Sequence, residues 1–113
     1  MAKSNKPIFW SLFAAGGTLA AFLAPVLVLL FLMAALGHIP VILGYAYLHA
    51  FAANWLGKLF LLGVITLFLW HAAHRLRVTL HDFGLRQDTL VALVVYLVAA
   101  AGTGLTVLCL LRI

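Results

Sequence analysis

The chain has 113 residues, of which 67% are hydrophobic and only 8% are charged. A soluble domain of this size leaves much of its surface in water and carries about 25% charged residues, so this composition excludes an ordinary soluble fold. The formal charge of +5 comes from basic residues at the ends of apolar runs rather than from a basic patch, which argues against nucleic acid as a partner. The single cysteine, Cys109, makes neither an internal disulfide nor an iron–sulfur site by itself.

The first apolar segment is too long for a single membrane crossing. No charged residue lies between Lys6 and Lys58, so the segment must contain a break, and residues 37–40 supply one because they hold a glycine and a proline. A crossing needs about 20 apolar residues, which places the first span at about residues 10–36. The length of this segment and the spans that follow it argue against a cleaved signal peptide.

Two further spans are predicted in the second half of the chain, at about residues 51–80 and 89–111. Lys58 and Arg75 flank the most apolar part of the second span, and both side chains are long enough to reach opposite interfaces. Gly84 is typical of a helix stop, and Asp88 or Thr89 is expected to cap the N-terminus of the third span.

The distribution of positive charge predicts the orientation. The basic residues that bear on it are Lys3 and Lys6 before the first span and Arg75, Arg77 and Arg86 around the link between the second and third spans. The link between the first two spans has no Lys or Arg. Because cytoplasmic loops are rich in these residues, we expect the N-terminus to be cytoplasmic and the C-terminus periplasmic. Together with the three spans, this predicts an all-α membrane protein with three transmembrane helices that forms one domain over residues 1–113.

Small residues on two spans are typical of close helix packing in lipid, where they let backbones approach. The first span contains residues 14–17, two alanines followed by two glycines, and the third contains residues 99–102, three alanines and a glycine. Alanine and glycine are also simply common in membrane helices, so the pattern alone leaves both interpretations open.

The polar end of the second span carries the chemistry. On a helix, His71, His74 and Arg75 share one broad face, whereas Trp70 and Arg77 point elsewhere. Histidines at a helix end in a membrane gain nothing unless they meet water, a partner or a ligand. Four interpretations stay open: a solvated helix end, hydrogen bonding to a quinone or similar head group, an axial haem ligand, or docking of an extrinsic subunit.

Trp10 favours the quinone interpretation. With the orientation above, Trp10 begins the first span on the side where Arg75 ends the second. The indole N–H and the guanidinium only donate hydrogen bonds, and a quinone offers two carbonyl acceptors. Alone, Trp10 is more typical of an interface anchor. Since no Asp or Glu lies inside a span, the proton acceptor must be a histidine, water or a carboxylate of another chain.

Taken together, these residues resemble the D subunit family of bacterial quinol:fumarate reductase, a family of small three-helix membrane anchors. The first motif is residues 7–17, PIFWSLFAAGG, followed by Ala24-Pro25; the second is Leu69-Trp70 with His74-Arg75 and His81-Asp82. A weaker match covers Ala50-Phe51-Ala52 with Gly57-Lys58 and Phe60. The length and the spacing of the spans also agree, so the resemblance extends over nearly the whole chain.

The resemblance implies a non-catalytic subunit of a four-subunit complex in the inner membrane. A flavoprotein with FAD and an iron–sulfur subunit lie on the cytoplasmic side, held by this chain and by a second anchor subunit. The resemblance implies that Trp10, His74 and Arg75 line a menaquinone pocket at the interface with the partners, while the second anchor subunit supplies the essential carboxylate. It implies no haem. The alternative is a haem-bearing succinate dehydrogenase anchor, with His71 or His74 as the axial ligand.

Overall fold

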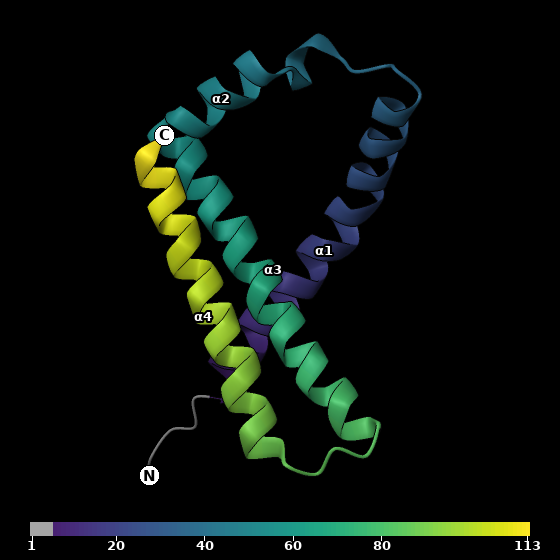
Figure 1. Ribbon diagram of the computed structural model, residues 1–113, viewed down its shortest axis with the longest axis vertical. Coiled ribbons are helices and arrows are strands. Elements are labelled where there is room, and N and C mark those ends of the chain that lie inside the picture. The colour runs from purple at the N-terminus through teal and green to yellow at the C-terminus, as the bar shows by residue number, and fades with distance from the viewer. Residues whose placement is uncertain (1–5) are drawn as a thin grey trace.

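A computed structural model describes residues 6–113, which are almost entirely helical and contain no strand (Figure 1). The elements are α1 (Lys6–Ala35), the short 3-10 helix η1 (Val41–Leu43), α2 (Tyr45–Ala53), α3 (Trp55–Asp82) and α4 (Asp88–Arg112). Three of these helices, α1, α3 and α4, are long and apolar enough to cross a membrane. The predicted all-α protein with three transmembrane helices is therefore confirmed. Lys3, on which the predicted orientation partly depends, lies outside the described residues.

The three long helices form an uneven bundle. α3 and α4 run side by side in opposite directions, whereas α1 crosses α3 with its first half and then leads away from it (Figure 1). The start of α1 lies at the same end as the α3–α4 link, and the C-terminus lies at the other end with α2 (Figure 1). The polar ends of α1 and α3 therefore share one end of the bundle. The side of the membrane that this end faces stays a prediction.

Two glycines end the helices that precede the links. Gly37 has a φ of 82°, and the N–H groups of Gly37 and His38 bond back to carbonyls of the last turn of α1. Gly84 has a φ of 98°, and together with Leu85 it repeats this arrangement at the end of α3. This left-handed conformation suits glycine and satisfies carbonyls that a helix end otherwise leaves unpaired. The helix stops predicted from these glycines are confirmed.

The starts of the helices are harder to predict from the sequence than their ends. The apolar segment that we join into one span from about residue 51 is divided at Asn54, whose side chain accepts the N–H of Leu56 at 3.0 Å and so begins α3. The cap predicted for α4 at Asp88 or Thr89 is wrong. Gln87 occupies the cap position without a side-chain bond, and the carboxylate of Asp88 is held by Arg77 instead of capping the helix.

Small residues set the distance between α1 and α3. Gly16 is buried, and a Cβ built on it would lie 2.7 Å from the carbonyl oxygen of Leu67. A Cβ on Gly17 would lie 2.8 Å from Cε1 of His71. The backbone of α1 approaches that of α3 this closely at Gly16 only because residue 16 has no side chain, and the missing side chain of Gly17 makes room for the ring of His71. This decides the open question for the glycines of the first span.

The contact between α3 and α4 combines small and aromatic residues. Ala73 and Ala99 are buried where the helices meet. The indole of Trp70 donates to Oγ1 of Thr103 at 3.2 Å, and its ring stacks on Tyr96 at 5.9 Å between centroids. Trp70 thus joins α3 to α4, which agrees with its predicted position away from the histidine face.

Candidate functional site

The three predicted site residues come from two helices at the same end of the bundle. Trp10 lies in the second turn of α1 and is 69% exposed. His74 and Arg75 lie on α3, where His74 is half-buried and Arg75 is exposed. Within residues 6–113, neither the indole N–H of Trp10 nor the guanidinium of Arg75 makes a hydrogen bond or an ion pair. Both donors therefore remain available to a partner or a ligand, and no contact among the described residues joins them.

Phe13 connects the two halves of the candidate site. Its ring stacks on His71 at 4.5 Å and meets the edge of His74 at 4.6 Å. Trp10 lies one helical turn before Phe13, and Arg75 directly follows His74. Because α1 and α3 pack against each other here, the contact of Phe13 with both histidines brings Trp10 and Arg75 to a similar level of the bundle.

His71 has a different role from the one that its helix face indicates. Its Nδ1 lies 3.0 Å from the carbonyl oxygen of Phe13. A carbonyl only accepts, so Nδ1 carries the proton and donates. With one ring face on Phe13 and the ring edge beside Gly17, His71 links α1 to α3. We therefore assign His71 to helix packing.

His74 belongs to a hydrogen-bonded chain that reaches α4. Its Nδ1 lies 3.1 Å from the hydroxyl oxygen of Tyr96, and Nη1 of Arg77 donates to that same oxygen at 3.4 Å. Arg77 is held in turn by Asp88: its Nε donates to Oδ1 at 2.9 Å, and its Nη2 forms an ion pair with Oδ2. Tyr96 was not singled out from the sequence. The available signal was a tyrosine in an apolar span two turns after an acid.

Breaking the ion pair between Arg77 and Asp88 is expected to loosen the α3–α4 end of the bundle. Asp88→Asn keeps the shape of the side chain but removes its charge, so the thermal midpoint of the complex should fall at low salt. The pair is partly exposed, and high salt screens such pairs, so the difference from the unchanged protein should shrink at a salt concentration of about 1 M. Asp82→Asn is the control, because Asp82 has no ion pair within residues 6–113. Equal midpoints for the two variants would contradict the prediction.

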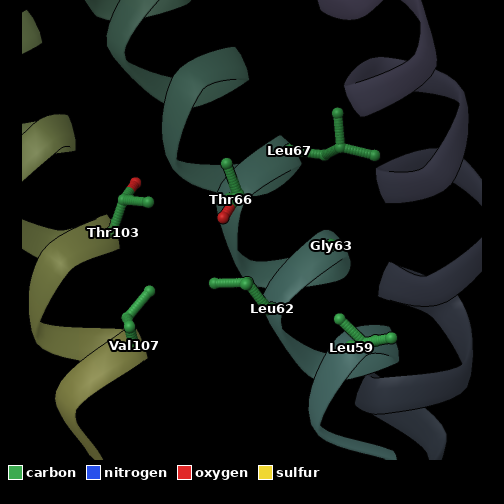
Figure 2. A pocket seen from close by; sticks show the side chains of 7 residues that line it. All are labelled: Leu59, Leu62, Gly63, Thr66, Leu67, Thr103 and Val107. Atoms are coloured by element: carbon green, nitrogen blue, oxygen red, sulfur yellow. The ribbon is translucent and has the colours of Figure 1, made fainter. Parts of the chain in front are cut away.

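An open apolar groove of about 560 Å³ lies elsewhere on the bundle, between α3 and α4 (Figure 2). It is lined by Leu59, Leu62, Gly63, Thr66, Leu67, Thr103 and Val107. Its polar groups are two threonine hydroxyls, and that of Thr103 already bonds to the carbonyl of Ala99. None of Trp10, His74 and Arg75 lines this groove. Its walls suit an acyl chain or apolar side chains rather than a polar head group.

Comparison with known proteins decides the family. The sequence model that describes the D subunit of fumarate reductase matches residues 1–111. The chain belongs to the fumarate reductase D subunit family. It is 37% identical to the fumarate reductase D subunit of Aliivibrio fischeri (strain MJ11), over 93% of this chain and 89% of the relative. It is 38% identical to that of Shewanella sp. (strain W3-18-1), over 89% of this chain and 85% of the relative.

Membership of the fumarate reductase D subunit family gives the three long helices a role. The chain is a multi-pass membrane protein and a membrane anchor subunit of a fumarate reductase complex. The resemblance that we infer from the two motifs is confirmed. The match also favours fumarate reductase over the alternative of a haem-bearing succinate dehydrogenase anchor.

Proposed function

We propose that this chain holds the flavoprotein and iron–sulfur subunits at the cytoplasmic face of the inner membrane. With the second anchor subunit, it forms a menaquinol site that feeds electrons toward fumarate. The end of the bundle at which α1 starts and α3 ends would face the cytoplasm. Arg75, Arg77 and Arg86 lie within or after the last eight residues of α3 at this end, and positive charge concentrates on the cytoplasmic side.

The proposal depends on one observation: Trp10 and Arg75 are exposed donors without partners in residues 6–113, on helices that Phe13 joins through its contacts with His71 and His74. Their chemistry fits a quinone, whose carbonyl oxygens accept hydrogen bonds. Both side chains lie on the outer surface of the chain, so a partner subunit must supply the opposite wall of the pocket. This chain therefore contributes half of the site.

The residues of this half bind and orient. Bound menaquinol supplies two electrons and two protons. Arg75 and Trp10 donate to carbonyl-type oxygens and fix their position, but neither side chain acts as a base. The chain has only two acids: Asp82 is the last residue of α3, about two turns beyond His74, and Asp88 is held by Arg77. The proton acceptor is therefore His74, water or a carboxylate of the second anchor subunit.

The test is Arg75→Leu in the complete complex. Loss of a charged hydrogen bond costs about 1.5–3 kcal/mol, so menaquinol-driven fumarate reduction should fall at least about tenfold. Reduction driven by a viologen dye, which donates electrons without the quinone site, should stay unchanged. Arg112→Leu is the matched control, because it makes the same replacement at the opposite end of the bundle (Figure 1). Normal menaquinol activity in Arg75→Leu would refute the site.

A further inference from the structure

The hydroxyl of Tyr96 has two neighbours that constrain its proton. Arg77 donates to the hydroxyl oxygen, and a guanidinium has no acceptor to offer in return. The hydroxyl proton therefore has to point to another group. The acceptor within reach is Nδ1 of His74, at 3.1 Å. The direction of hydrogen bonding thus runs from Arg77 through Tyr96 to His74.

The start of this chain of hydrogen bonds is fixed. Two nitrogens of Arg77 bind the two carboxylate oxygens of Asp88, which orients the planar guanidinium and aims Nη1 at Tyr96. The guanidinium carbon also lies 5.7 Å from the centre of the Tyr96 ring. The opposite assignment, with Nδ1 of His74 donating, would leave the hydroxyl proton of Tyr96 without an acceptor in the part of the chain that the structure describes. A hydroxyl proton without an acceptor costs free energy wherever water does not reach it, and Tyr96 is half-buried against α3.

If Nδ1 of His74 accepts, its proton lies on Nε2. The neighbouring His71, one helical turn earlier, has the opposite arrangement, because its Nδ1 donates to Phe13. The two histidines therefore differ in their free nitrogen: His71 keeps an acceptor, and His74 presents an N–H donor. This difference follows from contacts to α1 and to α4, not from the sequence of α3.

We infer that Tyr96 and Arg77 are positioning residues that hold His74 in its Nε2–H form, so that His74 donates a hydrogen bond beside Arg75 instead of accepting a proton. The inference rests on the proposed quinol site and deepens it. It assigns three donors, Trp10, Arg75 and His74, to this half of the site. The proton acceptor is then a carboxylate of the second anchor subunit or water.

The first test replaces Tyr96 by phenylalanine in the complete complex, which removes one hydroxyl and keeps the ring that stacks on Trp70. Nitrogen NMR of histidine-labelled complex, with the His74 signals identified by their loss in His74→Gln, should show an unprotonated Nδ1 in the unchanged protein. In Tyr96→Phe the His74 signals should shift toward the other tautomer.

The kinetics of Tyr96→Phe give a second readout. The KM for menaquinol should rise about fivefold, the effect of one neutral hydrogen bond, with dye-driven activity unchanged. Tyr45→Phe, on exposed α2, is the control.

The second test compares two replacements of His74. The amide nitrogen of Gln reaches roughly the position of Nε2 and donates, but unlike an imidazole it does not take up a proton near neutral pH. His74→Gln should keep menaquinol activity within about threefold, whereas His74→Leu should lose about tenfold, the cost of a strong hydrogen bond. Equal loss in both variants would mean that His74 is a base and would overturn the inference.

The NMR result separates this inference from the proposed function. A protonated Nδ1 in the unchanged protein, or signals that do not change in Tyr96→Phe, would overturn the role of Tyr96 even if Arg75→Leu abolishes menaquinol activity. Normal menaquinol activity in Arg75→Leu would refute the quinol site, and the NMR signals of His74 would still report its tautomer.

Discussion

Replacing Gly16 by alanine is expected to destabilise the packing of α1 on α3 by about 2 kcal/mol. The new Cβ would lie 2.7 Å from the carbonyl oxygen of Leu67 and 2.9 Å from Cβ of His71, and neither atom can rotate away. Overpacking costs about 1–3 kcal/mol and the strained bond from His71 to Phe13 about 1 kcal/mol, against a gain of about 1 kcal/mol in helix propensity. The thermal midpoint of the purified complex should therefore fall.

The same change should weaken the proposed quinol site. When α1 separates from α3, Phe13 moves away from His74. Trp10, which lies one turn before Phe13 on α1, moves with it. Lipid does not restore the contact, because acyl chains are as apolar as the helix faces and provide no hydrophobic drive for re-association. Menaquinol-driven activity should fall more than dye-driven activity.

Gly63→Ala is the matched control for Gly16→Ala. No atom lies within 4 Å of a Cβ at position 63, so alanine there should leave the midpoint unchanged or raise it through better helix propensity. If the two variants show the same midpoint and the same menaquinol activity, the close approach at Gly16 does not hold α1 in place.

The fold was largely predictable because its main determinants are local. A run without charge between Lys6 and Lys58, broken at residues 37–40, requires two spans, and glycine at a helix end has a defined conformational role. Asn54 was missed because the residues on both sides of it are equally apolar. Hydropathy does not distinguish one long helix from two helices joined by a cap, and the cap becomes evident only from the bond to Leu56.

The candidate site was predictable only in part. Hydrogen-bonding chemistry singled out Trp10 and Arg75, and the structure places both on the surface at one end of the bundle. A helical projection shows which residues of α3 share a face, but it does not show which neighbouring helix covers that face. His71 therefore appeared as a site residue although it packs on α1, and the link from His74 to Tyr96 on α4 could not be seen.

Replacing Gly57 by alanine is expected to open the elbow, which is the joint at Asn54 between α2 and α3. A Cβ at this position would overlap the carbonyl oxygen of Phe51, which belongs to the backbone, so a change of rotamer does not relieve the clash. The expected cost is at or above the upper end of the range of about 1–3 kcal/mol for overpacking. The edge-to-face contact between Phe51 and Phe60, at 5.9 Å, should be lost with it.

The consequences of this change should stay local, in contrast to those of Gly16→Ala. α2 and the C-terminus lie at the end of the bundle away from the start of α1 (Figure 1), so the KM for menaquinol should not change. Hydrogen exchange of the amides of residues 45–53 should become faster, because α2 loses its support on α3. Gly104→Ala, where a Cβ meets no atom within 4 Å, should leave both the exchange of these amides and the KM for menaquinol unchanged. Slow exchange in Gly57→Ala would show that the elbow tolerates a side chain, and a raised KM would show that the two ends of the bundle are coupled.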